Sequence, residues 1–399
     1  MNAQFPQPVS PPNDQSAGSR APEASVTAPV PEEANGILTI DLTALQANWK
    51  TLRSTAAASE CAGVVKANGY GCGLETIATA LLEAGCTTFF VADLGEGKRL
   101  RRVAPQATIY ILNGLAPGSG QTFATHNLRP VIGSTAELAE WDAFTGVHRW
   151  TGGFALHVDT GMNRLGVTVE EAAAIAPRLN RADHGVELLM SHFVASQYPE
   201  NPRNDQQMQA FRNIRALFRG IPASIANSSG IFLSPSAHLD LVRPGAAMYG
   251  VNPTPGKHNP MKPVVDLKAR IAQNRNVSAG ETVGYDATWT ARRPSRLATV
   301  AMGYADGFVR SASGSDNKRG GTLIVAGKHC PVIGRISMDL LCIDITDVPE
   351  SQARRGDYAT VIGEGRDLDS EGEMLGTIGY EVLTSLGHRF ARIYKRETD

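Results

Sequence analysis

The sequence predicts an α/β protein with two folded parts, an N-terminal (β/α)₈ TIM barrel and a C-terminal, mostly β domain. Two observations support this division. Strand and helix patterns alternate over residues 36–260, whereas residues 261–399 carry closely spaced strands separated by turn residues. A chain of 399 residues is long enough for two such domains.

The barrel prediction rests on eight short apolar runs bounded by turn residues, at 62–66, 88–92, 108–112, 129–132, 154–158, 187–191, 223–226 and 241–243. Helical spacing of apolar residues appears beside and between them, at 43–54, 75–84, 96–103, 136–144, 169–179 and 205–218. Parallel strands need helical crossovers, and an eight-stranded parallel sheet can close on itself. The alternative is an open, doubly wound sheet.

The segments that flank the barrel differ from it in composition. Residues 1–35 are rich in Pro, Ala, Ser and Gln and nearly free of large apolar side chains, so we expect a disordered extension without a secretory signal. A strand at 37–40 could pair with either domain. C-terminal strands are expected at 264–272, 298–302, 322–325, 340–345, 358–362 and 390–394, with a helix at 377–385.

Charge and cysteine content narrow the function. The 38 basic and 39 acidic residues nearly balance, which argues against nucleic acid and membranes as partners and favours small molecules. The five cysteines have no metal-ligand spacing, so neither a disulfide framework nor a metal site is expected. Reduced thiols and the lack of a long apolar stretch favour a cytoplasmic protein.

Polar residues follow several of the eight runs. They are Lys66, Asp159 with Arg164, His192, Asn227 with Ser228, and Arg243 with Gly245. Because barrel active sites form on the loops after strand C-termini, we expect these residues to converge on one rim. Taken alone, Lys66 could extend its charge from a strand end into solvent. If it is buried, its pKa falls and its amine becomes a nucleophile.

Nine motifs, in order, carry a family resemblance. They are 65–71 (VKANGYG), 159–166 (DTGMNRLG), 191–193 (SHF), 227–228 (NS), 243–245 (RPG), 284–288 (GYDAT), 303–307 (GYADG), 335–339 (RISMD) and 376–380 (GTIGY). From Gly36 onward the chain resembles bacterial alanine racemases. The resemblance implies a homodimer whose active sites use both subunits, pyridoxal 5′-phosphate as cofactor, and interconversion of L- and D-alanine for peptidoglycan.

The resemblance also implies roles for individual residues. Lys66 is expected to hold the cofactor covalently and to act as one base, with Tyr285 of the partner subunit as the base on the opposite face. His192 is expected to assist Tyr285, and Arg243 to face the cofactor's ring nitrogen. The cofactor-binding set is Lys66, Tyr70, His192, Asn227, Ser228, Arg243, Gly245, Ala246 and Tyr380. The substrate-binding set is Arg164, Met338, Tyr304 and Tyr285. Without the other motifs, Tyr285 could be an ordinary tyrosine in a strand, and His192 could be a structural histidine.

One of the departures from the family pattern bears on the substrate site, and three alternative functions remain open. His157 stands where many members of the family have a lysine that becomes carbamylated and orients the arginine at Arg164. We expect Arg164 to be oriented without carbon dioxide, through His157, water or a small anion. The alternative functions are a racemase of broader amino acid specificity, a related decarboxylase and a non-catalytic binding protein for the same cofactor.

Overall fold

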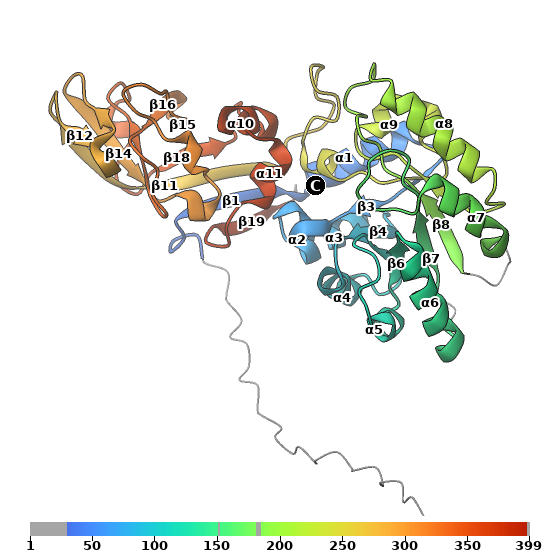
Figure 1. The fold of residues 1–399 in the computed structure, drawn as a ribbon. Coiled ribbons are helices and arrows are strands. Elements are labelled where there is room, and N and C mark those ends of the chain that lie inside the picture. Colours follow the sequence, from blue (N-terminus) through green and yellow to red (C-terminus); the bar gives the residue numbers. More distant parts are fainter. Residues whose placement is uncertain (1–29, 151, 181–184, 397–399) are drawn as a thin grey trace, which may run out of the picture.

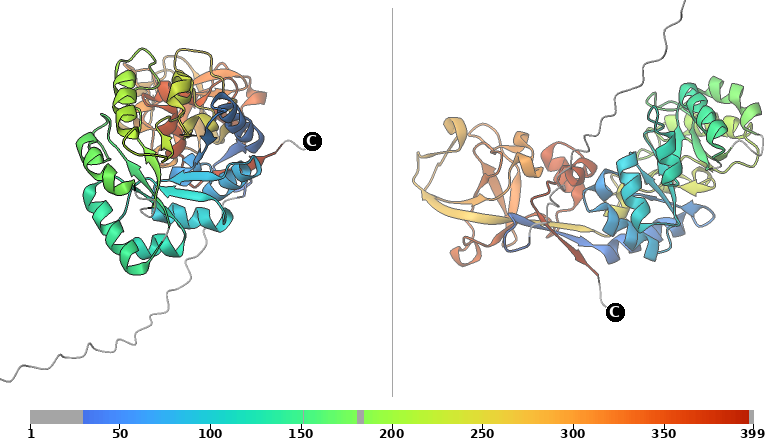
Figure 2. Two further views of the ribbon diagram at one scale, coloured as in Figure 1. Left: turned by 90° about the vertical axis from the view of Figure 1, so that its right-hand side faces the viewer. Right: turned by 90° about the horizontal axis from the view of Figure 1, so that it is seen from below.

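A computed structural model describes residues 30–150, 152–180 and 185–396. Figures 1 and 2 show a barrel and a second, β-rich domain side by side, with α2 (Lys66–Tyr70) and α11 (Gly379–Thr384) meeting between them. The predicted α/β architecture, a barrel followed by a mostly β domain, is confirmed. No helix in the described ranges is long and apolar enough to cross a membrane.

The barrel contains the eight predicted strands. Seven of them pair in parallel in chain order: β3 (Gly63–Val64), β4 (Thr88–Val91), β5 (Thr108–Ile111), β6 (Arg129–Ile132), β7 (Phe154–His157), β8 (Val186–Met190) and β9 (Ala223–Ser224). The eighth, β10 (Leu241–Val242), pairs in parallel with β2 (Glu60–Cys61), which leads into β3. The backbone N–H of Arg243 donates to the carbonyl of Ala226, at 2.9 Å. These contacts link β10 to both ends of the seven-stranded sheet and close it.

Helices surround these strands. They are α1 (Leu42–Thr55), α3 (Leu74–Glu83), α4 (Leu94–Val103), α5 (Gly120–Thr125), α6 (Thr135–His148), α7 (Val169–Leu179), α8 (Arg203–Arg215) and α9 (Gly230–Leu233). Side chains cap four of them: Asp41, Asp93, Ser134 and Thr168 accept from the backbone at the starts of α1, α4, α6 and α7. Each cap satisfies a backbone N–H that has no partner inside the helix.

The second domain is built on one mixed sheet with the strand order β14-β17-β16-β15-β18-β11-β1-β19, and β14 also pairs with β11. Its strands are β1 (Gly36–Asp41), β11 (Val265–Val277), β14 (Ser295–Val300), β15 (Thr322–Val325), β16 (Lys328–Ile333), β17 (Leu341–Asp344), β18 (Tyr358–Ile362) and β19 (Ala391–Lys395). A hairpin, β12 (Thr282–Val283) and β13 (Trp289–Thr290), and α10 (Leu368–Leu375) complete it. The sequence did not predict β16 or α10.

The start of the described chain belongs to the second domain. Strand β1 pairs antiparallel with β11 and parallel with β19, which decides the question that the sequence left open. Residues 30–35, expected to be part of a disordered extension, form a turn in which Ala34 is buried and the Arg270 guanidinium donates to the carbonyl of Pro31 at 2.8 Å. The rest of the expected extension, residues 1–29, lies outside the described residues.

Candidate functional site

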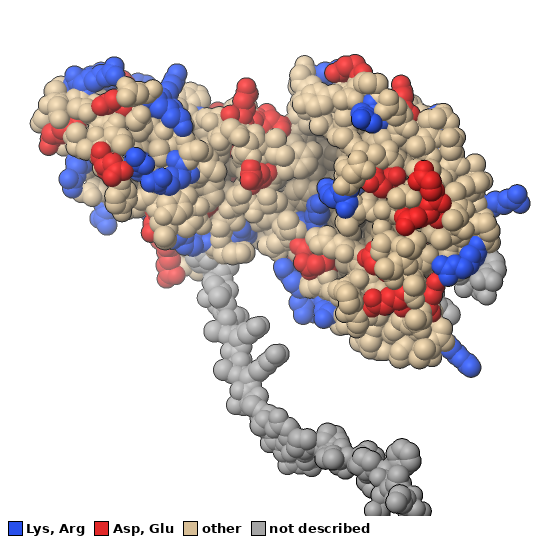
Figure 3. Space-filling view, in the orientation of Figure 1, with Lys and Arg blue, Asp and Glu red and all other residues tan. Residues whose placement is uncertain are grey.

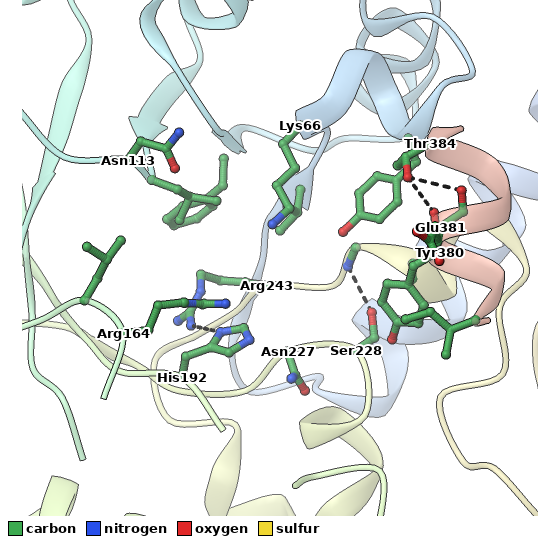
Figure 4. Close-up of a pocket in the computed structure, with 18 of the residues that line it drawn as sticks. Lys66, Asn113, Arg164, His192, Asn227, Ser228, Arg243, Tyr380, Glu381 and Thr384 are labelled. Atoms are coloured by element: carbon green, nitrogen blue, oxygen red, sulfur yellow. Dashed lines mark hydrogen bonds between the residues drawn. The ribbon is translucent and has the colours of Figure 1, made fainter. Parts of the chain in front are cut away.

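A cleft of about 890 Å³ lies where the barrel strands end and the second domain begins (Figure 4). Ten residues that the sequence assigns to the site line it: Lys66, Tyr70, Arg164, His192, Asn227, Ser228, Arg243, Gly245, Ala246 and Tyr380. His157 lines it too. The barrel therefore brings together most of the predicted residues at the carboxyl ends of its strands, as the barrel rule requires.

Lys66 begins α2, two residues after the end of the first barrel strand, whereas the sequence placed it at the end of that strand. In Figure 4 its amine points into the cleft. Burial lowers the pKa of the Lys66 amine; the positive charge of Arg164 lowers it further, and the negative charge of Glu96 opposes both. A lysine with a lowered pKa carries a larger fraction of neutral, nucleophilic amine at neutral pH.

Arg243 is buried, and its guanidinium contacts neutral groups. It donates to the carbonyl of Ser191 at 2.6 Å and to the Ser224 hydroxyl, and lies 3.4 Å from Nδ1 of His192. Burial lowers the pKa of Arg243 to about 9, so the guanidinium keeps its charge at neutral pH. The cleft thus contains a fixed cation that has other donor groups free for a ligand.

His192 is a neutral imidazole at physiological pH. Burial and then the charge of Arg243 lower the pKa of His192 to about 3. An arginine has no acceptor, so Nδ1 of His192 accepts the contact from Arg243, and the ring proton resides on Nε2. His157 is similar: burial, followed by the same arginine, lowers its pKa to about 4. Both rings are therefore uncharged beside two arginines.

Ser228 and the start of the 3₁₀ helix η2 (Ala246–Tyr249) form a cradle for an anion. The Ser228 hydroxyl oxygen accepts from the backbone N–H groups of Gly245, at 3.0 Å, and Ala247, at 3.3 Å. Its own proton is then directed away from them and is free to donate. A side chain at 245 would displace Tyr70, since a Cβ there would lie 2.3 Å from the Tyr70 hydroxyl.

Two tyrosines border the same cradle. Tyr70 packs against Tyr249 with the ring centroids 4.7 Å apart, and Tyr380 approaches from α11 of the second domain. Burial raises the pKa of both Tyr70 and Tyr380. Both hydroxyls therefore stay protonated near neutral pH and can donate to an anion. A serine hydroxyl, two tyrosine hydroxyls and backbone N–H groups suit a phosphate.

Arg164 is carried by a loop that Asp159 holds in place. One carboxylate oxygen of Asp159 accepts from the backbone N–H groups of Gly161 and Met162, each at 2.8 Å, and the other from Asn163 at 2.8 Å. The loop after β7 is thereby fixed, and Arg164 lies across the cleft from Lys66 in Figure 4. Asn227 is fixed too, because its side-chain oxygen accepts from Ser196 at 2.8 Å and from the backbone of Gly230 at 2.9 Å.

Three predicted residues do not line the cleft. Tyr285, Tyr304 and Met338, together termed the β-domain patch, expose 67%, 42% and 53% of their surface. Backbone N–H groups of residues 304 and 305 donate to the carbonyls of Ser337 and Met338, and Arg335 pairs with Asp286 at 2.9 Å. These contacts tie the three loops to one another, and none of the three residues lines the cleft that contains Lys66 of the same chain.

The sequence missed several residues that line the cleft. They are Asn113, after β5, and Thr377, Ile378, Glu381 and Thr384 around α11. The sequence carries a signal for two of them, since the motif at 376–380 includes Thr377 and Ile378, although the resemblance gives a role only to Tyr380. Among the described residues no group of His, Cys, Asp and Glu could hold a metal ion.

Comparisons with known proteins agree with this arrangement. Residues 40–253 match the family model for the N-terminal domain of alanine racemase, and residues 264–394 match the model for its C-terminal domain. An alanine racemase of Methylobacterium sp. (strain 4-46) is 50% identical over 357 residues, covering 90% of this chain and 97% of the relative. A catabolic alanine racemase of Mesorhizobium japonicum is 45% identical over 370 residues, with 92% and 95% coverage.

Solved structures give the same result. The crystal structure of alanine racemase from Bartonella henselae, with covalently bound pyridoxal phosphate, is similar with a TM-score of 0.86 and 38% identity. The match covers 91% of this chain and 100% of that one. The biosynthetic alanine racemase of Pseudomonas aeruginosa has a TM-score of 0.82 at 33% identity, with 91% and 99% coverage. The chain belongs to the alanine racemase family.

Proposed function

We propose that this chain interconverts L- and D-alanine with pyridoxal 5′-phosphate as cofactor, and that it supplies D-alanine for peptidoglycan. The observation that carries the proposal is a partly buried lysine with a lowered pKa in the same cleft as an anion cradle and a buried, charged arginine. The family to which the chain belongs supports the reaction, and the bound pyridoxal phosphate of the Bartonella henselae relative supports the cofactor.

The residues present fit this cofactor. The proposal places its phosphate next to Gly245, between Ser228, the N–H group of Ala246, and the hydroxyls of Tyr70 and Tyr380. The N–H of Gly245 already donates to Ser228. Arg243 would face the ring nitrogen, where its persistent charge would exclude it as a proton acceptor. When bound, pyridoxal phosphate withdraws electrons from the substrate and makes the Cα–H bond acidic. The protein's residues then decide which face of the substrate gains or loses a proton.

Lys66 and Tyr285 are proposed to be the two bases. Racemisation removes a proton from one face and returns one on the other, so two groups on opposite faces can do this without turning the substrate. The amine of Lys66, whose pKa is lowered by burial, serves one face. Within the chain no described tyrosine of the β-domain patch lines the cleft, so the proposal takes Tyr285 of the partner subunit for the other face. Arg164 binds the substrate carboxylate, for which a guanidinium is well shaped.

A homodimer with shared active sites follows from this assignment. The three large side chains of the β-domain patch are exposed in the single chain, where the surface of a second subunit would cover them. A test is to mix Lys66→Ala and Tyr285→Phe subunits. In each hybrid dimer one site regains both bases, so random reassociation should restore about a quarter of wild-type activity from two nearly inactive parents. If each active site were built from one chain alone, the mixture of the two variants would recover no activity.

The experiment that tests the function is the measurement of alanine racemisation with and without added pyridoxal phosphate. We expect racemisation that depends on the cofactor. Rates with lysine, arginine and serine should be far lower than with alanine, and comparable rates would favour the broader-specificity racemase. Carbon dioxide release would favour a decarboxylase, and cofactor binding without either reaction would favour a binding protein.

A further inference from the structure

The turn that carries Lys66 has a strained backbone. Four successive residues, Ala67, Asn68, Gly69 and Tyr70, have φ values of 53°, 56°, 64° and 51°. Left-handed backbone is disfavoured for residues with a Cβ, and here only one of the four is glycine. Such a conformation persists only where the surrounding structure enforces it. The contacts of this turn therefore identify the residues that determine where the Lys66 amine lies.

Glu96 makes the central contact. One carboxylate oxygen accepts from the backbone N–H of Asn68, within the left-handed turn, at 2.8 Å. The other accepts from the N–H of Ala92, just after β4, at 2.9 Å. Glu96 itself is held in the first turn of α4, where its backbone N–H donates to the capping Asp93 at 2.9 Å. Its carboxylate thus joins the end of a barrel strand to the turn that follows Lys66.

The side chain of Asn68 is held from the same helix. Its oxygen accepts from Arg99 at 2.7 Å, and Arg99 forms two further bonds of 2.7 Å to Glu75. The second domain holds the exit of the turn: Arg392 donates to the carbonyl of Gly71 at 3.1 Å. The turn is therefore held on the barrel side by α4 and on the other side by β19.

We propose that Glu96 is a positioning residue for Lys66, holding the left-handed turn so that the amine points into the cleft. The assignment rests on the proposed function, since it presumes that the cofactor is attached to Lys66. Glu96 also acts on the amine through space: its negative charge favours the protonated form of Lys66, against burial and Arg164. Loss of this carboxylate should change both the place and the protonation of the amine.

The barrel provides a matched control. Glu137 occupies the corresponding position in the first turn of α6 and accepts from Gly133, just after β6, at 2.9 Å. Its other oxygen accepts from Leu115, in the loop after β5, at 2.8 Å. Glu137→Gln therefore removes the same kind of bridge between neighbouring strand ends without touching the Lys66 turn. The two variants should lose similar stability and differ in their effect on the cofactor.

The test compares wild-type, Glu96→Gln and Glu137→Gln holoenzymes. Absorbance gives the dissociation constant of pyridoxal phosphate and the pH midpoint of the bound cofactor, and thermal unfolding gives stability. We expect Glu96→Gln to bind pyridoxal phosphate at least tenfold more weakly, with a displaced pH midpoint, and Glu137→Gln to stay within twofold of wild type. Equal cofactor affinity and equal midpoints in the two variants would overturn the role of Glu96.

A second variant, Glu96→Asp, tests the proposal if Glu96→Gln does not fold. Glu96→Asp keeps the charge but is one methylene shorter, so it cannot span both N–H groups, and we expect a loss of affinity in the same assay. Wild-type affinity in Glu96→Asp, if Glu96→Gln is insoluble, would overturn the proposal. A wild-type protein that binds no pyridoxal phosphate would refute the proposed function and this assignment together, whereas a difference confined to the variants concerns Glu96 alone.

Discussion

The cleft of the barrel and the β-domain patch carry the two halves of one predicted site under opposite physical conditions. In the cleft, Arg243 is buried, its pKa is lowered to about 9, and its hydrogen bonds are made within the chain. In the patch, Tyr285 exposes 67% of its surface. Figure 3, in which the cleft lies between the two domains, shows Lys and Arg interspersed with Asp and Glu on this face. The barrel half is thus preorganised within one chain, and the patch half needs a second surface.

The largest effect should come from the buried half. Lys66→Ala removes the only amine that the cleft presents among its described lining residues, so we expect racemisation to fall by at least about 10³-fold, because a base and the cofactor attachment are lost together. Borohydride reduction followed by peptide mapping should find the cofactor on Lys66 in the wild type and on no lysine in the variant. A reduced adduct on another lysine would refute the assignment.

Removal of the Tyr285 hydroxyl from the exposed half should slow the reaction of one enantiomer of alanine much more than that of the other. Tyr285→Phe keeps the ring and deletes the hydroxyl, so proton abstraction from L-alanine should fall by about 10²- to 10³-fold, the size of a general-base contribution. Abstraction from D-alanine, for which Lys66 on the opposite face would be the base, should fall far less. Exchange of the Cα hydrogen with deuterated solvent, followed for each enantiomer, measures this, and equal losses would contradict a dedicated second base.

The buried half should also make the protein sensitive to acid. Folding lowers the pKa of His157 to about 4 and of His192 to about 3, from 6.5, chiefly through burial. Below pH 6.5 the unfolded chain therefore binds protons that the folded chain does not, and stability falls as the pH falls towards 4. The slope should be about 1.4 kcal/mol per pH unit for each histidine.

Urea unfolding of the cofactor-free protein at pH 6.5, 5.5 and 4.5 measures this slope. His157→Gln should reduce it, whereas a change at the exposed Tyr285, such as Tyr285→Phe, should leave it as it is. A slope that is the same in His157→Gln and the wild type would show that this buried ring is not the source.

The two halves also differ in how far the sequence predicts them. The barrel strands are predictable because each is an apolar run between turn residues. Most of the cleft residues are predictable too, because they come shortly after the end of a strand in the sequence. The left-handed turn after Lys66 has no such pattern, since Glu96 and Arg392 enforce it from distant positions. Strand β16 begins with Lys328 and His329 and contains Pro331, so its sequence does not resemble a strand.

Long-range contacts explain the remaining errors. The turn at residues 30–35 is ordered by Arg270, more than 200 positions away, and its local composition resembles a disordered tail. Helix α10 contains Gly372 and three acidic residues, which weaken its apolar pattern. The residues of α11 that line the cleft depend on how the second domain docks against the barrel, which no local pattern specifies.

The smallest effect concerns Arg164, which stands at the edge of the buried half. Carbamylation needs a lysine amine, and His157 offers a neutral imidazole in the same cleft. We therefore expect wild-type activity to change less than about twofold when bicarbonate is removed and restored. His157→Lys supplies an amine and should acquire a bicarbonate response, which makes it the positive control. If wild-type activity is lost when bicarbonate is removed and returns when it is restored, a carbamate must form at a residue other than His157. Arg164 is then oriented by a group other than this histidine.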